Sequence, residues 1–240
     1  MSTNEINRLE EVSTFYAEGD YMDELLVDRE AEIISRVCLN RNNALEVGCG
    51  NGYSTLKLSG MFDRYEVLEG SPANVQLMQK RGLQQVICHT SLIEDFQTER
   101  RFDNIIFLNV IEHVEDSVAS LKKLEGLLTD EGQIYISAPN CMSLNRRVGY
   151  KMGLLKEYST LAPKDHILGH RRLYTVDMMN EHCAAAGLKV VEVKGVYLKP
   201  LSEKQMIELG DAAVRAFYAL GEDVPEYCAN IFAVARKKYY

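Results

Sequence analysis

Long apolar runs and paired cysteines are missing from this sequence of 240 residues. No apolar stretch approaches the ~18 residues that a membrane-spanning helix needs, so we expect no contact with a membrane. The opening segment Met1–Glu5 has neither a basic start nor an apolar stretch, so we expect no signal peptide. The six cysteines are scattered without a C-x-x-C pair, which predicts reduced core thiols and a cytoplasmic protein.

An excess of basic residues is also missing. Lys and Arg number 27 against 35 Asp and Glu, which leaves a net charge of −8. Because neutralising phosphates requires a basic surface, we expect no binding to nucleic acid. There is no internal repeat and no low-complexity linker, and the length suits one domain with additions. We therefore expect a single domain over residues 1–240.

Strand-like and helix-like segments alternate along most of the chain. The segment 104–108 is apolar throughout, as a strand buried on both faces should be. Such alternation predicts a doubly wound α/β fold: a seven-stranded, mostly parallel sheet whose last strand is antiparallel. The expected strands are 44–47, 65–69, 85–88, 104–108, 132–137, 188–196 and 228–235, and the expected helices are 21–38, 116–128, 176–186, 202–220 and two that begin near residues 53 and 72.

Three segments lie outside this alternation. Residues 1–36 hold ten acidic and three basic side chains, a net of −7, whereas residues 140–173 hold seven basic and two acidic ones, a net of +5. A segment of about thirty residues without regular pattern is usually functional when it lies inside a compact domain. We expect residues 1–36 to form lid helices, residues 140–173 to form a substrate cap that closes with them, and residues 200–227 to form a second insertion.

The most informative motif is the segment 45–52, LEVGCGNG, at the end of the first expected strand. Glycines there let the backbone approach a ligand closely at the mouth of an open α/β sheet. The spacing is G-x-G-x-G, not the G-x-G-x-x-G that opens a pyrophosphate-binding helix, and the carboxylate of Glu46 would repel a pyrophosphate. The same carboxylate suits a positively charged ligand, such as an amino group. An oxidoreductase that uses a nicotinamide dinucleotide is therefore disfavoured.

A second acidic residue, Glu69, ends the second expected strand. Because the carboxyl ends of parallel strands meet at one edge of a sheet, we expect Glu69 to lie beside the glycine loop. A ribose presents two hydroxyl donors and a carboxylate offers two acceptor oxygens. We therefore predict that Glu69 accepts both ribose hydroxyls of an adenosine. The alternative is that the glycines only form a turn and that Glu69 is a surface residue.

These residues resemble the class I S-adenosylmethionine-dependent methyltransferases, most clearly over residues 40–140. The resemblance implies S-adenosylmethionine as cofactor, S-adenosylhomocysteine as product and the Rossmann-like fold of that family. In the family, the glycine loop binds the methionine part of the cofactor, the acid after the second strand binds the ribose, and residues after the third strand contact the adenine. Carried over by position, the resemblance implies cofactor binding by Glu46, Gly48, Cys49, Gly50, Glu69, Gly70, Ser91, Leu92, Asn109 and His113.

The segment after the fourth expected strand indicates which type of methyltransferase this chain resembles. Residues 109–114 read NVIEHV, and the E-H-V within them is similar to a segment of the ubiquinone-biosynthesis type of O-methyltransferase. The Asn- or Asp-Pro-Pro-aromatic segment that nucleobase amino methyltransferases usually carry there is missing. The long insertion resembles those of small-molecule methyltransferases from bacterial natural-product and surface-sugar pathways.

The insertion 140–173 supplies the candidate acceptor site, because both its ends are expected near the carboxyl ends of the strands. Histidine can take a proton, and arginine can bind a carboxylate or phosphate through two parallel hydrogen bonds. A metal held by Asp165 and the two nearby histidines is a weaker alternative, since Gly169 disfavours a helix there, and we expect no metal. The candidate residues are His166 and His170 for proton transfer, and Asn140, Arg146, Arg171 and Tyr174, flanked by Arg147 and Arg172, for the acceptor.

The whole pattern predicts an enzyme that moves a methyl group from S-adenosylmethionine to an oxygen or nitrogen, with oxygen favoured. The basic insertion, in a chain whose remainder carries −13, predicts a polar or anionic small molecule as acceptor, such as a metabolite, a natural-product intermediate or a sugar. We expect Tyr16 or Tyr21 of the lid to reach the cofactor, in a monomer or homodimer. The alternatives are a catalytically silent cofactor-binding scaffold and, less favoured, an NAD-dependent oxidoreductase.

Overall fold

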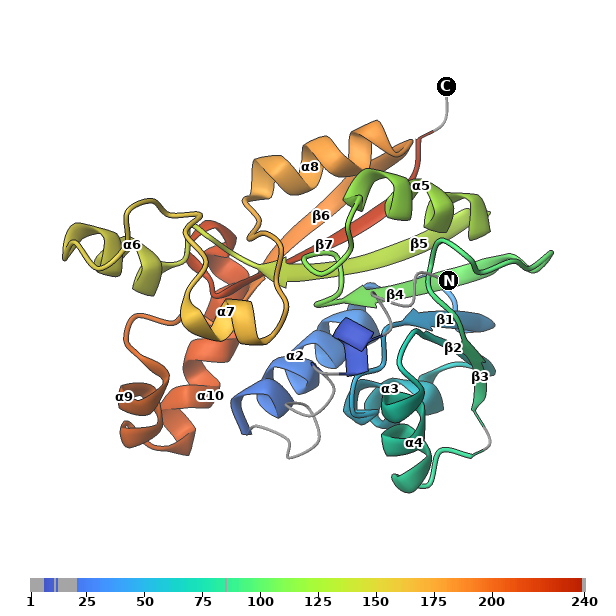
Figure 1. The fold of residues 1–240 in the computed structure, drawn as a ribbon, viewed down its shortest axis with the longest axis horizontal. Helices are drawn as coiled ribbons and strands as arrows, with labels where there is room; N and C mark the ends of the chain where they lie inside the picture. Colours follow the sequence, from blue (N-terminus) through green and yellow to red (C-terminus); the bar gives the residue numbers. More distant parts are fainter. Residues whose placement is uncertain (1–6, 11, 13–20, 85, 239–240) are drawn as a thin grey trace.

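The computed structural model describes residues 7–10, 12, 21–84 and 86–238, and one seven-stranded sheet forms its centre (Figure 1). The strands are β1 (Asn43–Val47), β2 (Arg64–Glu69), β3 (Ile87–Thr90), β4 (Phe102–Leu108), β5 (Leu128–Pro139), β6 (Leu188–Val196) and β7 (Asn230–Lys237). Their order in the sheet is β3-β2-β1-β4-β5-β7-β6. Neighbours among β1 to β5 pair in parallel, whereas β7 pairs antiparallel with both β5 and β6. The predicted fold class is therefore confirmed.

Helices cover both faces of the sheet (Figure 1). They are α2 (Tyr21–Val37), α3 (Tyr53–Leu58), α4 (Pro72–Lys80), α5 (Ser117–Leu127), α6 (Leu144–Lys151), α7 (Pro163–Ile167), α8 (Val176–Ala185), α9 (Glu203–Glu208) and α10 (Asp211–Leu220), with short 3₁₀ helices at Ser59–Met61, Gly221–Asp223 and Pro225–Tyr227. In Figure 1, α5 and α8 lie on one face and α2, α3 and α4 on the other. Residues 7–10 and 12 are also helical.

The hydrophobic core has two parts, one on each face of the sheet. Along β4, Ile105 and Phe107 pack into the part that α5 and α8 cover, and Ile106 between them packs into the part that α2 covers. This alternation follows from the two-residue repeat of a strand, and it explains why β4 is apolar at every one of these positions. No helix in the described ranges is both long and apolar enough to cross a membrane.

Several expected elements differ from the observed ones. The third strand begins two residues later than expected, at Ile87 rather than residue 85. The helix expected over 202–220 is two helices, α9 and α10, because Gly210 between them has a φ of 88°, which is outside the helical region. The insertion 140–173, expected to lack a regular pattern, holds the short helices α6 and α7.

Local signals at the helix starts behave as the sequence predicts. Ser71 caps α4, where its side chain accepts a hydrogen bond from the Asn74 amide, and Pro72 follows at the first turn. Asp116 caps α5 in the same way through the amide of Ala119. These caps matter for function because both helices begin at the carboxyl edge of the sheet, where an α/β fold binds its ligands.

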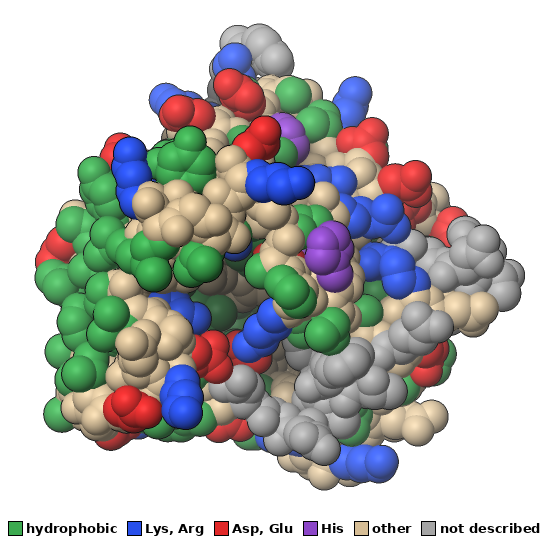
Figure 2. Space-filling view, turned by 60° about the vertical axis from the view of Figure 1, so that its left-hand side comes forward, with side chains coloured by type: hydrophobic (Ala, Val, Ile, Leu, Met, Phe, Trp, Pro, Cys, Tyr) green, Lys and Arg blue, Asp and Glu red, His purple; other side chains and the backbone are tan. Residues whose placement is uncertain are grey.

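Exposed hydrophobic side chains gather at the end of the molecule that holds α6 and α9. Met152 and Leu154, just after α6, are 67% and 72% exposed, and Ile207 and Leu209 at the end of α9 are also exposed. Figure 2 shows hydrophobic side chains concentrated along one side of the face that looks toward this end. They lie apart from the cavity described next.

Candidate active site

A cavity of about 660 Å³ opens at the carboxyl ends of β1, β2 and β4. Its size is typical of a small-molecule site. Helix α2, the N-terminal residues 8, 9 and 12, and the end of the insertion near residue 170 complete its wall. Ten of the residues that the sequence singles out line this cavity: Gly48, Cys49, Gly50, Glu69, Gly70, Ser91, Leu92, Asn109, His113 and His170.

The glycine loop after β1 packs too tightly for side chains. At Gly48, φ is +77° and a Cβ atom would lie 2.6 Å from a methyl carbon of Val110 in the loop after β4. At Gly52, φ is +80° and a Cβ would lie 2.7 Å from the Cα of Met78 in α4. Both values are well below contact distance, so glycine is required for backbone conformation and for space. The loop between them, residues 49–51, lies on the cavity wall.

Glu46 lies behind this loop rather than on the cavity wall. Its carboxylate accepts hydrogen bonds from the hydroxyls of Ser54, Thr55 (2.6 Å) and Tyr65 (3.1 Å). Burial raises the pKa of Glu46 to about 7, and the three hydroxyls oppose that rise. The carboxylate of Glu46 thus connects β1 to the first turn of α3. Glu46 is not among the described residues that line the cavity, so the structure does not place it in direct contact with a ligand.

Glu69 has a buried carboxylate that lines the cavity at the end of β2. Its Oε2 accepts the amide of Cys49 at 2.9 Å, and its Oε1 accepts the amide of Ser71 at 2.8 Å. The carboxylate therefore joins the glycine loop to the start of α4. These charge-assisted hydrogen bonds fix the orientation of Glu69 before any ligand binds.

The end of β3 forms the neighbouring wall. The amide of Ser91 donates to the carbonyl of Glu69 at 3.1 Å, which fixes the loop that carries Leu92. Gly70 faces this loop closely, since a Cβ there would lie 2.8 Å from side-chain carbons of both Leu92 and Leu9. The side chains of Leu9 and Leu92 therefore pack against the backbone of Gly70 and form an apolar part of the wall beside Glu69.

Asn109 ends β4 with a φ of 54°, in the left-handed region. Its amide nitrogen donates to both carboxyl oxygens of Glu30 on α2, at 3.3 and 3.4 Å, and its oxygen accepts from the Asn230 amide at 2.5 Å. Burial raises the pKa of Glu30 to about 8. Asn109 thus joins α2, β4 and β7 beneath the cavity. The sequence analysis did not single out its two partners, Glu30 and Asn230.

Glu112, His113 and His170 form a polar cluster on the wall between the loop after β4 and the insertion. One ligand-type atom from each lies within 4.8 Å of the others. The imidazole rings of the two histidines are 4.9 Å apart and nearly perpendicular. Glu112 Oε2 is buried and has no hydrogen-bond partner among the described residues. Burial raises the pKa of Glu112 to about 7 and lowers that of His113 to about 3.

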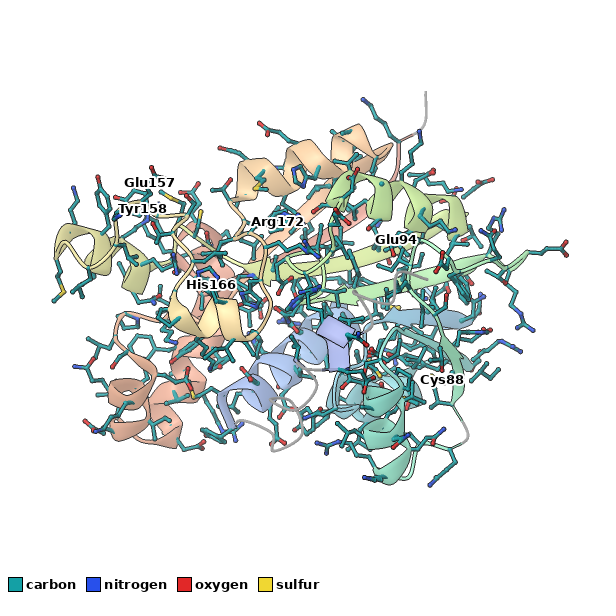
Figure 3. All side chains as sticks on the ribbon, in the orientation of Figure 1. Cys88, Glu94, Glu157, Tyr158, His166 and Arg172 are labelled. Atoms are coloured by element: carbon teal, nitrogen blue, oxygen red, sulfur yellow. The ribbon has the colours of Figure 1, made fainter. Side chains whose placement is uncertain are left out.

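The structure separates the two histidines proposed for proton transfer. Nδ1 of His170 lies 3.0 Å from Oδ1 of Asp165, and the ring lines the cavity. Burial opposes ionisation of Asp165, but the hydrogen bonds from His170 and from the Ala162 amide lower its pKa. His166 is exposed on α7 and does not line the cavity (Figure 3). Only His170 can therefore reach a ligand in this arrangement.

The arginines that end the insertion bind backbone rather than the cavity. Arg172 donates to the carbonyls of Ile111 (3.2 Å), Val114 (2.6 Å) and Glu115 (2.8 Å), and Arg171 donates to that of His113 at 2.9 Å (Figure 3). A guanidinium has five N–H donors and suits such a row of carbonyls. Both arginines thereby fix the loop after β4, and neither is among the described residues that line the cavity.

The other proposed acceptor residues also have structural partners and lie off the cavity wall. Arg146 donates to the carbonyls of Tyr158 (3.0 Å) and Thr160. The buried amide of Asn140 donates to the carbonyls of Glu226 (3.1 Å) and Cys228 (2.9 Å). Tyr174 is buried with its hydroxyl 2.8 Å from that of Ser117. Asn140, Arg146, Arg171 and Tyr174 are not among the described residues that line the cavity, so their role in binding the acceptor remains a prediction from the sequence.

Residues near the N-terminus cross the mouth of the cavity. Arg8 donates to the carbonyls of Gly169 (2.9 Å) and His113 (3.1 Å), and Glu10 accepts from the Ser71 hydroxyl at 2.8 Å. The contact of Arg8 with Gly169 joins the two segments that the sequence predicts to close together, whereas the contacts with His113 and Ser71 had no signal in the sequence.

Of the two tyrosines, Tyr16 or Tyr21, expected to reach the cofactor, the structure describes one. Tyr16 lies outside the described residues. Tyr21 begins α2, is 44% exposed and donates its hydroxyl to Asp211 of α10. Its position at the α2–α10 contact accounts for its absence from the described cavity wall.

Comparisons with known proteins agree with this geometry. The sequence model of the family described as "Methyltransferase domain" matches residues 20–193. A Rickettsia felis protein named ubiquinone biosynthesis O-methyltransferase is 23% identical over 197 residues, which are 80% of this chain and 79% of that protein.

Two solved structures have similar folds. The N-methyltransferase NodS from Bradyrhizobium japonicum, in complex with S-adenosylhomocysteine, is 15% identical with a TM-score of 0.61, over 98% of this chain and 100% of that one. The 1,6-didemethyltoxoflavin-N1-methyltransferase from Burkholderia thailandensis, with 1,6-didemethyltoxoflavin and S-adenosylhomocysteine bound, is 17% identical with a TM-score of 0.63, over 98% of this chain and 88% of that one. At such identities the likeness shows the fold.

Proposed function

This chain belongs to the methyltransferase domain family, and we propose that it transfers the methyl group of S-adenosylmethionine to a hydroxyl oxygen of a small-molecule acceptor. The observation that carries the proposal is the position of Glu69. Its oriented carboxylate lines the cavity beside the glycine loop, and Gly70 and Leu92 line the cavity next to it. In this proposal the carboxylate accepts from the ribose, the glycine loop takes the methionine part and Leu92 contacts the adenine ring.

Separate features of the cavity wall fit the parts of this cofactor. Asn74 also lines the cavity near Glu69, and its buried Oδ1 has no hydrogen-bond partner among the described residues. The cavity residues at α2 include the carboxylates of Asp23 and Glu24, which favour a cationic ligand over an anionic one. A pyrophosphate would meet these charges unfavourably, so a nicotinamide dinucleotide fits less well.

The cofactor, when bound, supplies a methyl group on a positively charged sulfur that is already reactive. The protein therefore mainly has to align the acceptor with that group and to exclude water. Residues 8–10 help to exclude water from the cavity. Arg8 donates a hydrogen bond to the insertion on one side of the cavity, and Glu10 accepts hydrogen bonds from the start of α4 on the other side.

A hydroxyl acceptor must lose its proton as the new C–O bond forms. His170 lies on the wall of the cavity, and Asp165 holds its Nδ1. A carboxylate that accepts from Nδ1–H leaves Nε2 as the unprotonated nitrogen, which can accept a proton. We therefore assign proton acceptance to Nε2 of His170, and Asp165 positions the ring.

The acceptor is better described as polar than as anionic. The insertion arginines proposed to bind an anion are engaged with backbone carbonyls, and Glu112, Glu115 and Asp116 line the cavity beside His170. Such a wall disfavours a carboxylate or phosphate next to it. The net charge of −8 likewise favours a small molecule over a nucleic acid.

Oxygen is preferred to nitrogen as the methylated atom on two grounds. The E-H segment after β4 places Glu112 and His113 on the cavity wall, and the Rickettsia felis relative is named an O-methyltransferase. The NodS neighbour is an N-methyltransferase, and amine acceptors are therefore the second candidate class.

Calorimetric titration and turnover together test this function. We expect S-adenosylhomocysteine to bind and NADH not to bind. Methyl-labelled S-adenosylmethionine, incubated with matched panels of hydroxylated and amino compounds, should label a hydroxylated product. Binding of the nucleoside product without turnover on any panel would support the silent scaffold instead, and NADH binding alone would overturn the proposal.

A further inference from the structure

Helix α2 carries a completely buried carboxyl group on the side that faces the cavity. Asp23, Leu26 and Val27 of this helix line the cavity. Glu30 follows Leu26 by four residues and Val27 by three, so it lies on the same face of the helix, about one turn further along. It is 0% exposed. Helix α2 therefore brings Glu30 to the end of the sheet beneath the cavity.

The partner of Glu30 is the residue that directly follows β4. Nδ2 of Asn109 donates to both carboxyl oxygens of Glu30, at 3.3 and 3.4 Å, and Oδ1 of Asn109 accepts from Asn230 of β7 at 2.5 Å. The φ of Asn109 is 54°, in the left-handed region that residues other than glycine adopt rarely. Such a conformation persists where the surrounding structure holds it, and here α2 and β7 hold the side chain from two directions.

The backbone turn at Asn109 sets the course of the loop after β4. Val110 is the next residue, and it packs so closely on Gly48 that a Cβ there would lie 2.6 Å from a methyl carbon of Val110. Glu112 and His113 of the same loop line the cavity. Since these residues follow Asn109 directly, a change of its φ would move them together. The hydrogen bonds of Asn109 therefore affect both the glycine loop and the polar wall of the cavity.

Packing alone does not account for a carboxyl group at this position. Burial raises the pKa of Glu30 to about 8, the hydrogen bonds from Asn109 oppose that rise, and the charge of Glu112 adds to it. At neutral pH the group is therefore mostly a neutral acid. An aliphatic side chain would fill the same space without the cost of burying a polar group. A polar side chain here indicates a task that needs its hydrogen bonds.

We propose that Glu30 is a positioning residue for methyl transfer, which holds Asn109 in its left-handed conformation and so keeps the loop after β4 aligned with the glycine loop. The proposal rests on the proposed function, since it assigns Glu30 a part in that reaction. Glu30 is not among the described residues that line the cavity, so it acts through Asn109. Loss of its hydrogen bonds misaligns the two sides of the cavity and leaves the contacts of Glu69 with the glycine loop in place.

Two replacements of Glu30 test this role. Methionine has a similar length and no hydrogen-bonding group of comparable strength, whereas glutamine keeps an acceptor oxygen for Asn109. In Glu30→Met we expect kcat to fall at least about tenfold, with a change of less than about threefold in the Kd of S-adenosylhomocysteine. Glu30→Gln should keep kcat near the wild-type value. Hydrogen exchange of the amides in residues 109–114 should be faster in Glu30→Met only.

Glu32→Met is the matched control, because Glu32 is exposed on the same helix and pairs with Arg29. It should leave kcat, the Kd and the exchange of residues 109–114 unchanged. Asn109→Gly breaks the same hydrogen bonds from the other end and should lower kcat as well. In that background Glu30→Met should cause no further loss, because the two residues act as one unit.

Three results would overturn the role of Glu30. The first is a wild-type kcat in Glu30→Met, and the second is an equal further loss from Glu30→Met in the Asn109→Gly background. The third applies if Glu30→Met does not fold, and it is a wild-type kcat in Asn109→Gly. A wild-type protein that neither binds S-adenosylhomocysteine nor methylates any compound would instead contradict the proposed function itself.

Discussion

Arg8 donates a hydrogen bond of 2.9 Å to the carbonyl of Gly169, although the two residues are 161 positions apart. Gly169 has a φ of +74°, and a Cβ there would lie 2.7 Å from Nη1 of Arg8. The second guanidinium nitrogen donates to the carbonyl of His113 at 3.1 Å. One side chain thereby joins the N-terminal residues, the insertion and the loop after β4 over a single cavity.

Removing Arg8 should open the site. In Arg8→Ala the contacts with Gly169 and His113 are lost, and we expect S-adenosylhomocysteine to dissociate at least about tenfold faster because the residues over the cavity are no longer held. Stopped-flow displacement measures this rate. Arg101→Ala is the matched control, since Arg101 is exposed and, among the described residues, its side chain donates to the carbonyls of its neighbours Glu99 and Arg100. An unchanged dissociation rate in Arg8→Ala would show that residues 8–10 do not act as a lid over the cavity.

Replacing Glu69 should weaken cofactor binding by at least about tenfold, since a hydrogen bond to a charged acceptor contributes ~1.5–3 kcal/mol. Glu69→Gln is preferable to Glu69→Ala, because the carboxylate also holds the amides of Cys49 and Ser71. Calorimetry with S-adenosylhomocysteine gives the affinity. Glu66→Gln, a buried carboxylate on the same strand that pairs with Arg64 and Arg100 away from the cavity, should change thermal stability and leave the affinity unchanged.

The two histidines of the insertion should differ sharply in turnover. His170→Ala removes the proposed proton acceptor, and we expect kcat to fall by about a hundredfold with little change in the KM for S-adenosylmethionine. His166→Ala should leave both constants near the wild-type values, because that side chain is exposed on α7. Steady-state kinetics with the acceptor found in the labelling screen measures both. Equal effects from the two substitutions would contradict the assignment to His170.

Asp165→Asn tests how the ring of His170 is held. Asparagine can place an NH₂ group opposite Nδ1 and so favour the tautomer with the proton on Nε2, which cannot accept another. We expect kcat to fall while cofactor affinity stays unchanged. A fall in melting temperature alone, with normal kcat, would leave Asp165 a structural residue that binds the Ala162 amide.

Stability should decline as the pH rises, because of Glu30. Its pKa is raised from 4.5 to about 8 in the folded chain, mainly by burial. The folded protein therefore retains a proton that the unfolded chain releases in this window, so the free energy of unfolding falls between pH 4.5 and about pH 8. Glu30→Gln should reduce that decline in thermal melts. Part of the decline should remain in this variant, because the pKa values of Glu46 and Glu112 are also raised, to about 7.

Glu32→Gln is the control for that measurement, since Glu32 is exposed on the same helix and should retain the full wild-type decline. If the slope of melting temperature against pH is the same in Glu30→Gln as in the wild-type protein, Glu30 does not retain its proton on folding.

The order of elements and the cofactor end of the site could be inferred from the sequence, because local patterns carry them. A strand buried on both faces is apolar throughout, as in residues 104–108, and a Ser-Pro pair marks the start of α4. Glycines at Gly48 and Gly52 and an acid at Glu69 stand at fixed distances from strand ends, so the parallel sheet necessarily brings them to one edge.

The partners of long polar side chains were decided only by the tertiary structure. Arg171 and Arg172 have the charge that an anion site needs, yet carbonyls of the loop after β4 come within reach and take up their donors. Likewise, neither Glu30 nor Asn74 stands out in the chain. The pKa of Glu30 is raised because the side chain is completely buried. The amide NH₂ group of Asn74 faces Glu69, and its Oδ1 has no hydrogen-bond partner among the described residues. Burial and hydrogen-bond partners depend on segments distant in sequence, which no local pattern encodes.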